Sequence, residues 1–361
     1  MGPGPSCCYP EVYKALSLPT LGYLDPKFTA IMDAIQLQLR MLMQTKNLWT
    51  FPISGTGSAG METGFANLIE PGDTVLVLVN GVFSGRMVEV ATRLGAHVDK
   101  VEFPWGKPID IEKVKDALST EKYKLVAAVH AETSTGVLNP VDELGKLLKT
   151  TETLFLVDTV TSLGGIDVQV DAWGIDVTYS GSQKCLSCPP GLSPMSFSQK
   201  AIEAITKRKN KVPNFYFDAS LLAQYWQTER PRVYHHTPPI NLLYGLHQAL
   251  SLILTEGIDR VQQRHRKNYL LLKKGIEGMG LQMFVDSPYQ LPMLNTVLIP
   301  PKIDDIKVRQ LLRTNHKIEI GGGMGQLAGK IWRIGLMGHT SRPENVKRFL
   351  KAMDLTFHEV Q

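Results

Sequence analysis

Between residues 50 and 200, short apolar runs alternate with segments in which apolar side chains recur at helical spacing. Thr74–Val79 is typical of a strand buried on both faces, and it follows a Pro-Gly-Asp turn. Residues 84–94 place their apolar side chains on one helical face and end at a glycine. The same order repeats with a strand at 124–129, a helix at 141–149 and a strand at 153–157. This alternation predicts a mostly parallel sheet covered by helices on both faces.

The pattern changes after residue 240, where the chain reads as long helices up to residue 280 with no strand between them. The remainder mixes strand-like runs with helices: strands at Thr296–Ile299 and Lys317–Ile320, helices at 304–313 and 343–353. We therefore predict an α/β protein in three parts: an N-terminal segment (1–22), a large domain (23–257) and a small C-terminal α+β domain (258–361).

Composition narrows the classes of function. The net charge of +5 over 361 residues is too small and too spread out to indicate a nucleic-acid surface, although it suits small anionic substrates. No apolar run is long enough for a membrane helix, so no membrane partner is expected. Four cysteines in a chain of this length favour a reducing compartment. With no signal peptide or peroxisomal signal recognised, we expect a cytoplasmic location. The single Cys185-x-x-Cys188 pair leaves a tetrahedral site incomplete, so no metal is expected.

Lys184 is the first candidate for chemistry. It follows a β-like run that ends in Ser180-Gly181-Ser182-Gln183, and Pro189-Pro190-Gly191 beyond it prevents a continuing helix. We therefore expect Lys184 in a loop at the end of a strand, where open α/β sheets bind their ligands. Because a lysine by itself is more commonly a surface cation, its significance depends on its neighbours.

Asp158 is the second candidate, because it ends the apolar run Leu154–Val157. A buried carboxylate there needs a cationic partner to offset its desolvation. A protonated pyridine nitrogen would be such a partner, and holding that proton makes pyridoxal phosphate an electron sink. A helix N-cap or a metal ligand are alternative interpretations of the same residue.

Residues 54–60 read Ser-Gly-Thr-Gly-Ser-Ala-Gly between a strand-like run and a helix. Glycines let the backbone approach a phosphate, and the helix N-terminus supplies free N–H groups. The spacing also matches the dinucleotide fingerprint, which requires an acid at the end of the next strand. That strand ends at Val79-Asn80-Gly81 without a carboxylate, which favours a phosphate cup over a nicotinamide site.

With these three features in place, the sequence resembles the class V, fold-type I aminotransferases of the alanine–glyoxylate / serine–pyruvate group. This resemblance implies that the mostly parallel sheet of the large domain has seven strands. The resemblance runs over nearly the whole chain and rests on the order and spacing of its motifs. These are Gly2-Pro3-Gly4-Pro5-Ser6, Ser54-Gly55-Thr56-Gly57, His130–Gly136, Val157-Asp158-Thr159-Val160, Ser180–Lys184, Tyr234-His235-His236-Thr237, Gly321-Gly322-Gly323 and Trp332–Gly338.

The resemblance implies that pyridoxal phosphate is bound to Lys184 as a Schiff base and that Lys184 also shuttles the proton. Asp158 would pair with the ring nitrogen, and Val160 and Phe83 would lie against the two ring faces. The other implied cofactor contacts are Thr133 to the phenolic oxygen and Gly57, Ser58 and Gln183 to the phosphate, with Thr56 as a further cofactor-binding residue. Tyr234 and Thr237 would reach the phosphate from the neighbouring subunit, which implies a homodimer with shared active sites.

Arg333 is the best candidate for substrate binding, because a guanidinium binds a carboxylate bidentately and every amino or 2-oxo acid substrate has one. Gly22 and Tyr23 match a loop that contacts substrate in relatives. We therefore predict ping-pong transamination between a small amino acid (alanine or serine) and a 2-oxo acid, preferably glyoxylate.

Three alternatives remain open at this stage. Ureidoglycine–glyoxylate and 3-hydroxykynurenine transaminases share the same motifs. A pyridoxal-phosphate lyase or desulfurase would need a nucleophilic cysteine late in the chain, and none follows Cys188. A nucleotide-binding or purely structural α/β protein would leave Lys184, Asp158 and Arg333 unexplained.

Overall fold

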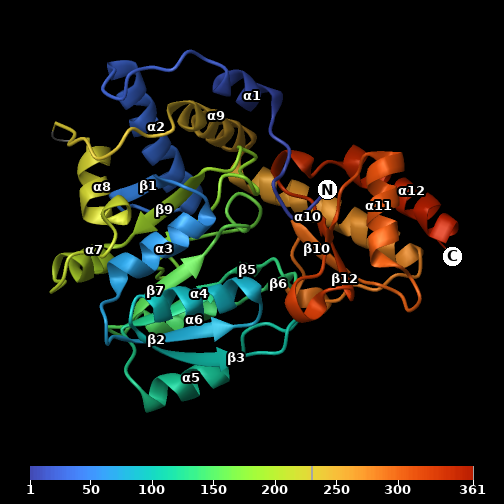
Figure 1. The fold of residues 1–361 in the computed structure, drawn as a ribbon, viewed down its shortest axis with the longest axis horizontal. Helices are drawn as coiled ribbons and strands as arrows, with labels where there is room; N and C mark the ends of the chain where they lie inside the picture. The colour runs from blue at the N-terminus through green and yellow to red at the C-terminus, as the bar shows by residue number, and fades with distance from the viewer. Residues whose placement is uncertain (229–230, 361) are drawn as a thin grey trace.

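The computed structural model describes residues 1–228 and 231–360, in which two larger sheets lie side by side (Figure 1). A third sheet has only two short strands, β5 (Ala131–Glu132) and β6 (Val137–Leu138). The larger sheet has seven strands in the order β1-β9-β8-β7-β4-β2-β3, and all neighbouring pairs are parallel except those made by β9. The mostly parallel seven-stranded sheet predicted from the sequence is thus confirmed. Its strands are β1 (Trp49–Ser54), β2 (Thr74–Val79), β3 (His97–Glu102), β4 (Leu125–Val129), β7 (Leu154–Asp158), β8 (Val177–Tyr179) and β9 (Leu192–Phe197).

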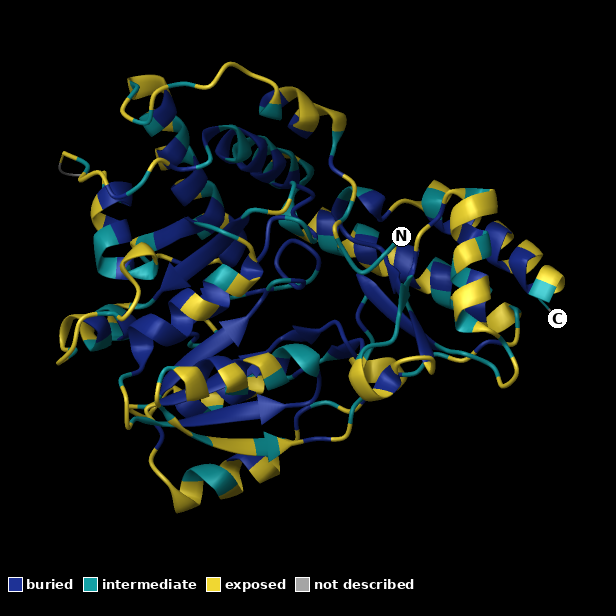
Figure 2. Cartoon of the chain, viewed as in Figure 1, coloured by how far each residue is buried: buried dark blue, intermediate teal, exposed yellow. Residues whose placement is uncertain are grey.

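Helices cover this sheet. Helices α3 and α4 pack on each other and against strands β2, β8 and β9, whereas α5 and α6 pack on each other and against β3 and β7. The central strands β4 and β7 are therefore buried along their whole length, while the edge strand β3 is largely exposed (Figure 2). The helices are α1 (Pro10–Leu16), α2 (Pro26–Met43), α3 (Gly57–Leu68), α4 (Val82–Arg93), α5 (Ile111–Thr120), α6 (Val141–Leu148), α7 (Gln199–Thr206), α8 (Ala219–Trp226), α9 (Ile240–Glu256) and α10 (Ile258–Gly278).

Local sequence signals set where these helices begin and end. Helix α2 begins at Pro26 because the Asp25 side chain accepts a hydrogen bond from the Lys27 N–H, which caps the first turn. Helices α9 and α10 are divided at Gly257, whose φ of 92° lies in the region that only glycine adopts without strain. The predicted long helical stretch therefore becomes two helices that pack against each other.

The second sheet belongs to the C-terminal third and has the order β10-β12-β11. Its elements are β10 (Leu294–Leu298), β11 (Gly321–Gly322) and β12 (Ile331–Gly335), with α11 (Asp305–His316) and α12 (Pro343–Val360). The predicted strand at Lys317–Ile320 is wrong. Lys317 caps α11 in the left-handed region, and Ile318 and Ile320 are buried without forming ladder hydrogen bonds. The alternation of apolar and polar residues at 317–320 therefore reflects alternating burial and not a strand.

Two main hydrophobic cores follow the two larger sheets, and a small third cluster includes Ala131, Cys185 and Met293. The larger one surrounds the seven-stranded sheet, and a smaller one joins α10, α11 and α12 to β12 through residues such as Trp332 and Phe349. This division agrees with two domains, although the predicted boundary at residue 257 stays a prediction. None of the described helices is long and apolar enough to cross a membrane.

Candidate active site

The loops that follow the parallel strands all lie at one edge of the large sheet. Strand β2 leads into the start of α4, β4 into residues 130–136, β7 into Asp158–Val160 and β8 into the loop with Lys184. Because the carboxyl ends of parallel strands share an edge, residues far apart in sequence meet there.

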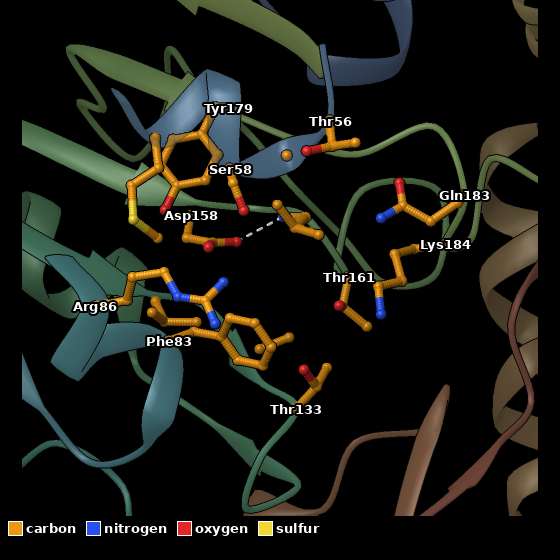
Figure 3. A pocket seen from close by; sticks show the side chains of 15 residues that line it. Thr56, Ser58, Phe83, Arg86, Thr133, Asp158, Thr161, Tyr179, Gln183 and Lys184 are labelled. Atoms are coloured by element: carbon orange, nitrogen blue, oxygen red, sulfur yellow. Dashed lines mark hydrogen bonds between the residues drawn. The ribbon is translucent and has the colours of Figure 1, made fainter. Parts of the chain in front are cut away.

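An open cavity of about 700 Å³ lies at this edge (Figure 3). Nine of the cofactor-binding residues predicted from the sequence line it: Thr56, Gly57, Ser58, Phe83, Thr133, Asp158, Val160, Gln183 and Lys184. The mixture of apolar walls with a few polar groups is typical of a site for a small organic ligand.

Asp158 lies on one side of the cavity, at the end of β7, and is 5% exposed. Its Oδ1 accepts a hydrogen bond of 2.7 Å from the Val160 N–H. Burial nevertheless raises the pKa of this carboxyl to about 7, because too few neighbours stabilise its charge. A cation placed against Asp158 would restore the ionised form.

Lys184 lies on the other side of the cavity (Figure 3). Burial, and then the positive charge of Arg333, lower the pKa of its amine to about 8. Its Nζ donates a 2.5 Å hydrogen bond to the Pro3 carbonyl oxygen, so the Gly-Pro-Gly-Pro motif lies against the reactive lysine. Gly4 has a φ of 106°, and a Cβ there would lie 2.6 Å from Nζ.

The third feature is the start of α3. Its N-cap residue Thr56 makes no side-chain capping hydrogen bond, and the N–H groups of Gly57 and Ser58 have no partner within the described residues, which leaves them for an anion. A Cβ on Gly57 would lie 2.9 Å from Val160 Cγ2, so glycine keeps this turn close to the cavity wall. Gln183 also lines this cavity, and its buried Oε1 has no hydrogen-bond partner within the described chain.

Phe83 and Val160 supply apolar walls of the cavity. A residue that was not predicted, Arg86, lies beside Phe83 in the same wall. Arg86 follows Phe83 by three residues on α4, and its guanidinium lies 5.3 Å from the Phe83 ring centroid. It also lines the cavity. The sequence analysis missed Arg86, although the spacing of three on a predicted helix placed it on the same face as Phe83.

A buried carboxylate holds the Phe83 and Thr133 segments together. Glu132 is fully buried, and its two oxygens accept hydrogen bonds from the backbone N–H and hydroxyl groups of Ser84 and Ser134. Ser134 Oγ also accepts from the Val82 N–H at 2.9 Å. The first turn of α4 and the loop after β4 are therefore fixed to each other.

Arg333 extends from β12 towards this loop. Its Nε donates to the Gly322 carbonyl oxygen at 2.7 Å and its Nη1 to the Thr133 carbonyl oxygen at 3.3 Å. Nη2 makes no hydrogen bond within the described residues, which leaves donors for a ligand carboxylate. Burial lowers the pKa of Arg333, but its guanidinium stays charged.

Five predicted site residues are not among those that line the cavity of their own chain: Arg333, which contacts the lining residue Thr133, and the four residues Gly22, Tyr23, Tyr234 and Thr237. Gly22 is exposed, and the Tyr23 ring packs on the Tyr234 ring with centroids 4.9 Å apart. Tyr234 is 52% exposed, and its hydroxyl lies 3.2 Å from Thr237 Oγ1. None of the four lines the cavity, so a single chain does not bring them together with Lys184.

Other lining residues missed by the sequence analysis are Met61, Val129, Ala131, Thr161 and Tyr179. Two of them had a usable signal: Val129 and Ala131 alternate with His130 in an extended segment, so they share a side with Thr133. Tyr179 had none, because a tyrosine in an apolar run is a normal core residue. Burial and the nearby Asp158 carboxylate raise the pKa of its hydroxyl.

These groups fit pyridoxal phosphate. Asp158 would hold the ring nitrogen, Lys184 would carry the aldehyde carbon, and the start of α3 with Gln183 would hold the phosphate. The raised pKa of Asp158 and the unpartnered Gln183 oxygen show that the chain alone does not satisfy the polar groups of the cavity. A doubly covered parallel sheet with this site defines a pyridoxal-phosphate enzyme of fold type I.

Comparison with known proteins identifies the family. The profile of the class V aminotransferases matches residues 11–349. An (S)-ureidoglycine–glyoxylate transaminase of Bacillus subtilis is 40% identical over 372 residues, covering 98% of this chain and 89% of the relative. An alanine–glyoxylate aminotransferase of Drosophila melanogaster is 40% identical over 357 residues, covering 98% and 91%. The crystal structure of an alanine–glyoxylate aminotransferase from Nostoc sp. has a TM-score of 0.97 at 48% identity, covering 99% and 94%.

The chain therefore belongs to the class V aminotransferase family. It is a pyridoxal-phosphate-dependent aminotransferase, as the resemblance in the sequence implied.

Proposed function

We propose that this aminotransferase transfers the amino group of alanine or serine to glyoxylate in a ping-pong cycle. The observation that carries the proposal is the position of Arg333, which lies next to Thr133 and close enough to Lys184 to lower its pKa. A guanidinium there would bind the α-carboxylate of both substrates in turn. The relatives named as alanine–glyoxylate aminotransferases support the choice of substrates.

Asp158, Lys184 and Arg333 would each have a separate role in the reaction. When bound, pyridoxal phosphate withdraws electrons from the Cα–H bond of an amino acid and stores the amino group between half-reactions. Asp158 would keep the ring nitrogen protonated. Lys184 Nζ, with its pKa lowered to about 8, would take the Cα proton and return it. Arg333 would orient the substrate so that this proton faces Nζ.

We also propose that the active form is a homodimer. Tyr234 and Thr237 would complete the phosphate site of the neighbouring subunit, while Gly22 and Tyr23 would contact its substrate. Exposed apolar side chains between residues 13 and 48, and at residues 215–216 and 233–234, support this arrangement: Tyr13, Leu18, Leu24, Leu37, Met41, Leu48, Phe215, Tyr216, Val233 and Tyr234.

A second candidate is ureidoglycine–glyoxylate transamination, which is favoured by the name of the Bacillus subtilis relative. The two candidates differ only in the donor, so a panel of donors decides between them. Alanine, serine, ureidoglycine and 3-hydroxykynurenine would each be tested with glyoxylate and with pyruvate. The proposal expects the highest kcat/KM with alanine or serine and glyoxylate, and a clear preference for ureidoglycine would replace it.

Arg333→Ala tests the role of the arginine in the same assay. We expect KM to rise for both donor and acceptor, while the absorbance of the bound cofactor remains. Arg348→Ala, at an exposed arginine of α12 that donates to the His316 carbonyl oxygen and does not line the cavity, serves as the matched control. Loss of the cofactor absorbance in Arg333→Ala with unchanged KM values would contradict the assignment.

A further inference from the structure

Two neighbouring histidines, His235 and His236, lie between the residues proposed to reach the phosphate of the neighbouring subunit. His235 is 9% exposed, and its ring is stacked on the Phe215 ring with centroids 4.8 Å apart. His236 is half-buried, and its ring lies tilted against the Tyr216 ring with centroids 5.0 Å apart. The short helix η1 (Phe215–Phe217) and the residues next to it therefore hold both imidazoles against aromatic surface.

The ring nitrogens of the two histidines belong to a continuous chain of hydrogen bonds. At one end, His235 Nε2 lies 3.1 Å from the Phe215 carbonyl oxygen. In the middle, the Nδ1 atoms of His235 and His236 lie 2.8 Å apart. At the other end, His236 Nε2 lies 2.7 Å from Ser54 Oγ. All four ring nitrogens thus have a partner inside the protein.

With both rings neutral, the donors and acceptors of this chain can be assigned in only one way. A carbonyl oxygen only accepts, so His235 carries its proton on Nε2. Its Nδ1 must then accept, and the donor is the Nδ1–H of His236. His236 Nε2 has no proton left and accepts from the Ser54 hydroxyl. Burial, and then the neighbouring His235, lower the pKa of His236 to about 4, so its ring is neutral at pH 7.

Ser54 connects this chain of hydrogen bonds to the phosphate cup. It is the last residue of β1, directly before the glycine turn that leads into α3. Its carbonyl oxygen accepts a hydrogen bond of 3.1 Å from the Tyr216 hydroxyl, and the Gly55 N–H donates to the Gly191 carbonyl oxygen at 2.9 Å. The two histidines are therefore anchored to the cup of their own chain, although the residues that flank them would serve the cup of the neighbour.

We propose that this chain of hydrogen bonds holds Tyr234 and Thr237 in the position from which they bind the cofactor phosphate of the neighbouring subunit. The hydroxyls of Tyr234 and Thr237 lie 3.2 Å apart, so a shift of the backbone between them would displace both. Ser54, His235 and His236 are then positioning residues, which act on the phosphate only through those two hydroxyls. The inference rests on the proposed homodimer with shared sites.

His236→Phe tests the proposal, because it keeps an aromatic ring and removes both hydrogen bonds of the central residue. We would titrate the cofactor-free full-length protein with pyridoxal phosphate and, separately, with pyridoxal, which lacks the phosphate, and follow the absorbance of the bound ligand. We expect the affinity for pyridoxal phosphate to fall about tenfold and the affinity for pyridoxal to stay the same. An equal loss for both ligands would indicate a general disruption of the cavity and would overturn the proposal.

A pair of variants at Ser54 guards against a folding defect. Ser54→Ala removes the hydroxyl and should show the same selective loss, whereas Ser54→Thr keeps the hydroxyl and should bind both ligands like the parent protein. His97→Phe, at an exposed histidine of β3, is the matched control for His236→Phe and should also bind like the parent. Parent affinity in Ser54→Ala, or the same loss in Ser54→Thr, would contradict the assigned donor.

The double variant Tyr234→Ala, Thr237→Val separates this inference from the proposed sharing of sites. If the double variant binds pyridoxal phosphate as tightly as the parent, the shared phosphate site is wrong and the role of the histidines is wrong with it. If it binds more weakly, adding His236→Phe should cause no further loss, because His236 acts through the two residues already removed. A further loss would refute the role of His236 and leave the shared site standing, as would an unchanged affinity in His236→Phe alone.

Discussion

Two titrating side chains face each other across the active-site cavity, and burial shifts both towards their neutral forms. Burial raises the pKa of Asp158 to about 7, and burial with the Arg333 charge lowers that of Lys184 to about 8. The neutral Lys184 amine is the form that can attack an aldehyde, whereas Asp158 lacks the cationic partner that would restore its ionised form. Both residues could be predicted because each follows an apolar strand, but their pKa values could not.

Asp158→Asn should stabilise the cofactor-free protein and weaken the holoenzyme. The folded-state pKa lies above the unfolded value, so the stability contributed by Asp158 is present below about pH 4 and is lost as pH rises to about 7. Above pH 7 the neutral Asn avoids this cost, and we expect roughly 1–3 kcal/mol more stability in the apoprotein. Urea unfolding of both apoproteins at pH 5 and pH 8 measures the difference in their free energies of unfolding. If the gain from Asp158→Asn is no larger at pH 8 than at pH 5, Asp158 is not a desolvated carboxylate.

Lys184 should react with added pyridoxal phosphate faster as pH rises, with a midpoint near 8, because only the neutral amine is a nucleophile. Arg333→Gln removes the second cause of the lowered pKa, so its midpoint should lie at higher pH. Stopped-flow absorbance of reconstitution between pH 6 and 10 gives both midpoints, with Lys184→Ala as the blank. Identical midpoints in the parent and Arg333→Gln proteins would rule out this coupling.

At the scale of secondary structure, the loop after β4 and the first turn of α4 act as one unit because Glu132 bonds to both. The sequence placed Phe83 and Thr133 in the site separately. It gave no sign that a carboxylate between them fixes their relative position, because hydrogen bonds across 48 residues depend on the tertiary fold.

Glu132→Gln should loosen this unit. One of the backbone N–H groups of Ser84 or Ser134 would face an amide N–H instead of an oxygen, which costs about 1–3 kcal/mol. Urea unfolding measures the loss, and the circular dichroism of bound cofactor should weaken as Phe83 becomes less ordered. Glu143→Gln, at an exposed position in the first turn of α6, should change stability by less than about 0.5 kcal/mol. Equal stability of the two variants would show that Glu132 holds nothing in place.

For the whole molecule, the proposed sharing of sites between subunits can be tested by complementation. Lys184→Ala chains lack the lysine, and chains with both Tyr234→Ala and Thr237→Val lack the contacts to the neighbouring site. In a mixed dimer, one site would combine the intact parts of both chains. Co-expressed chains should therefore regain about a quarter of the parent activity if they assort at random.

Activity no greater than the sum of the separate variants would show instead that each chain builds its own site. Sedimentation velocity of each preparation verifies that the mixed and unmixed proteins have the same oligomeric state.

The sequence determined the parts of this protein that depend on local order along the chain. Buried strands, the helix starts, the glycine turn at the start of α3 and the strand-end positions of Asp158 and Lys184 all follow from periodicity and turn chemistry. The same reasoning failed at Lys317–Ile320, because alternating burial looks like a strand whether or not a partner strand is present.

Only the tertiary structure decided which of these parts meet. It brought Pro3 to Lys184, Arg333 to Thr133 and Arg86 to the cavity, and it left Tyr234 outside. These contacts span up to 200 residues, and no local pattern encodes them. The physical reason is that packing of the two sheets and their helices, and not the propensity of any segment, sets the distances on which charge and burial depend.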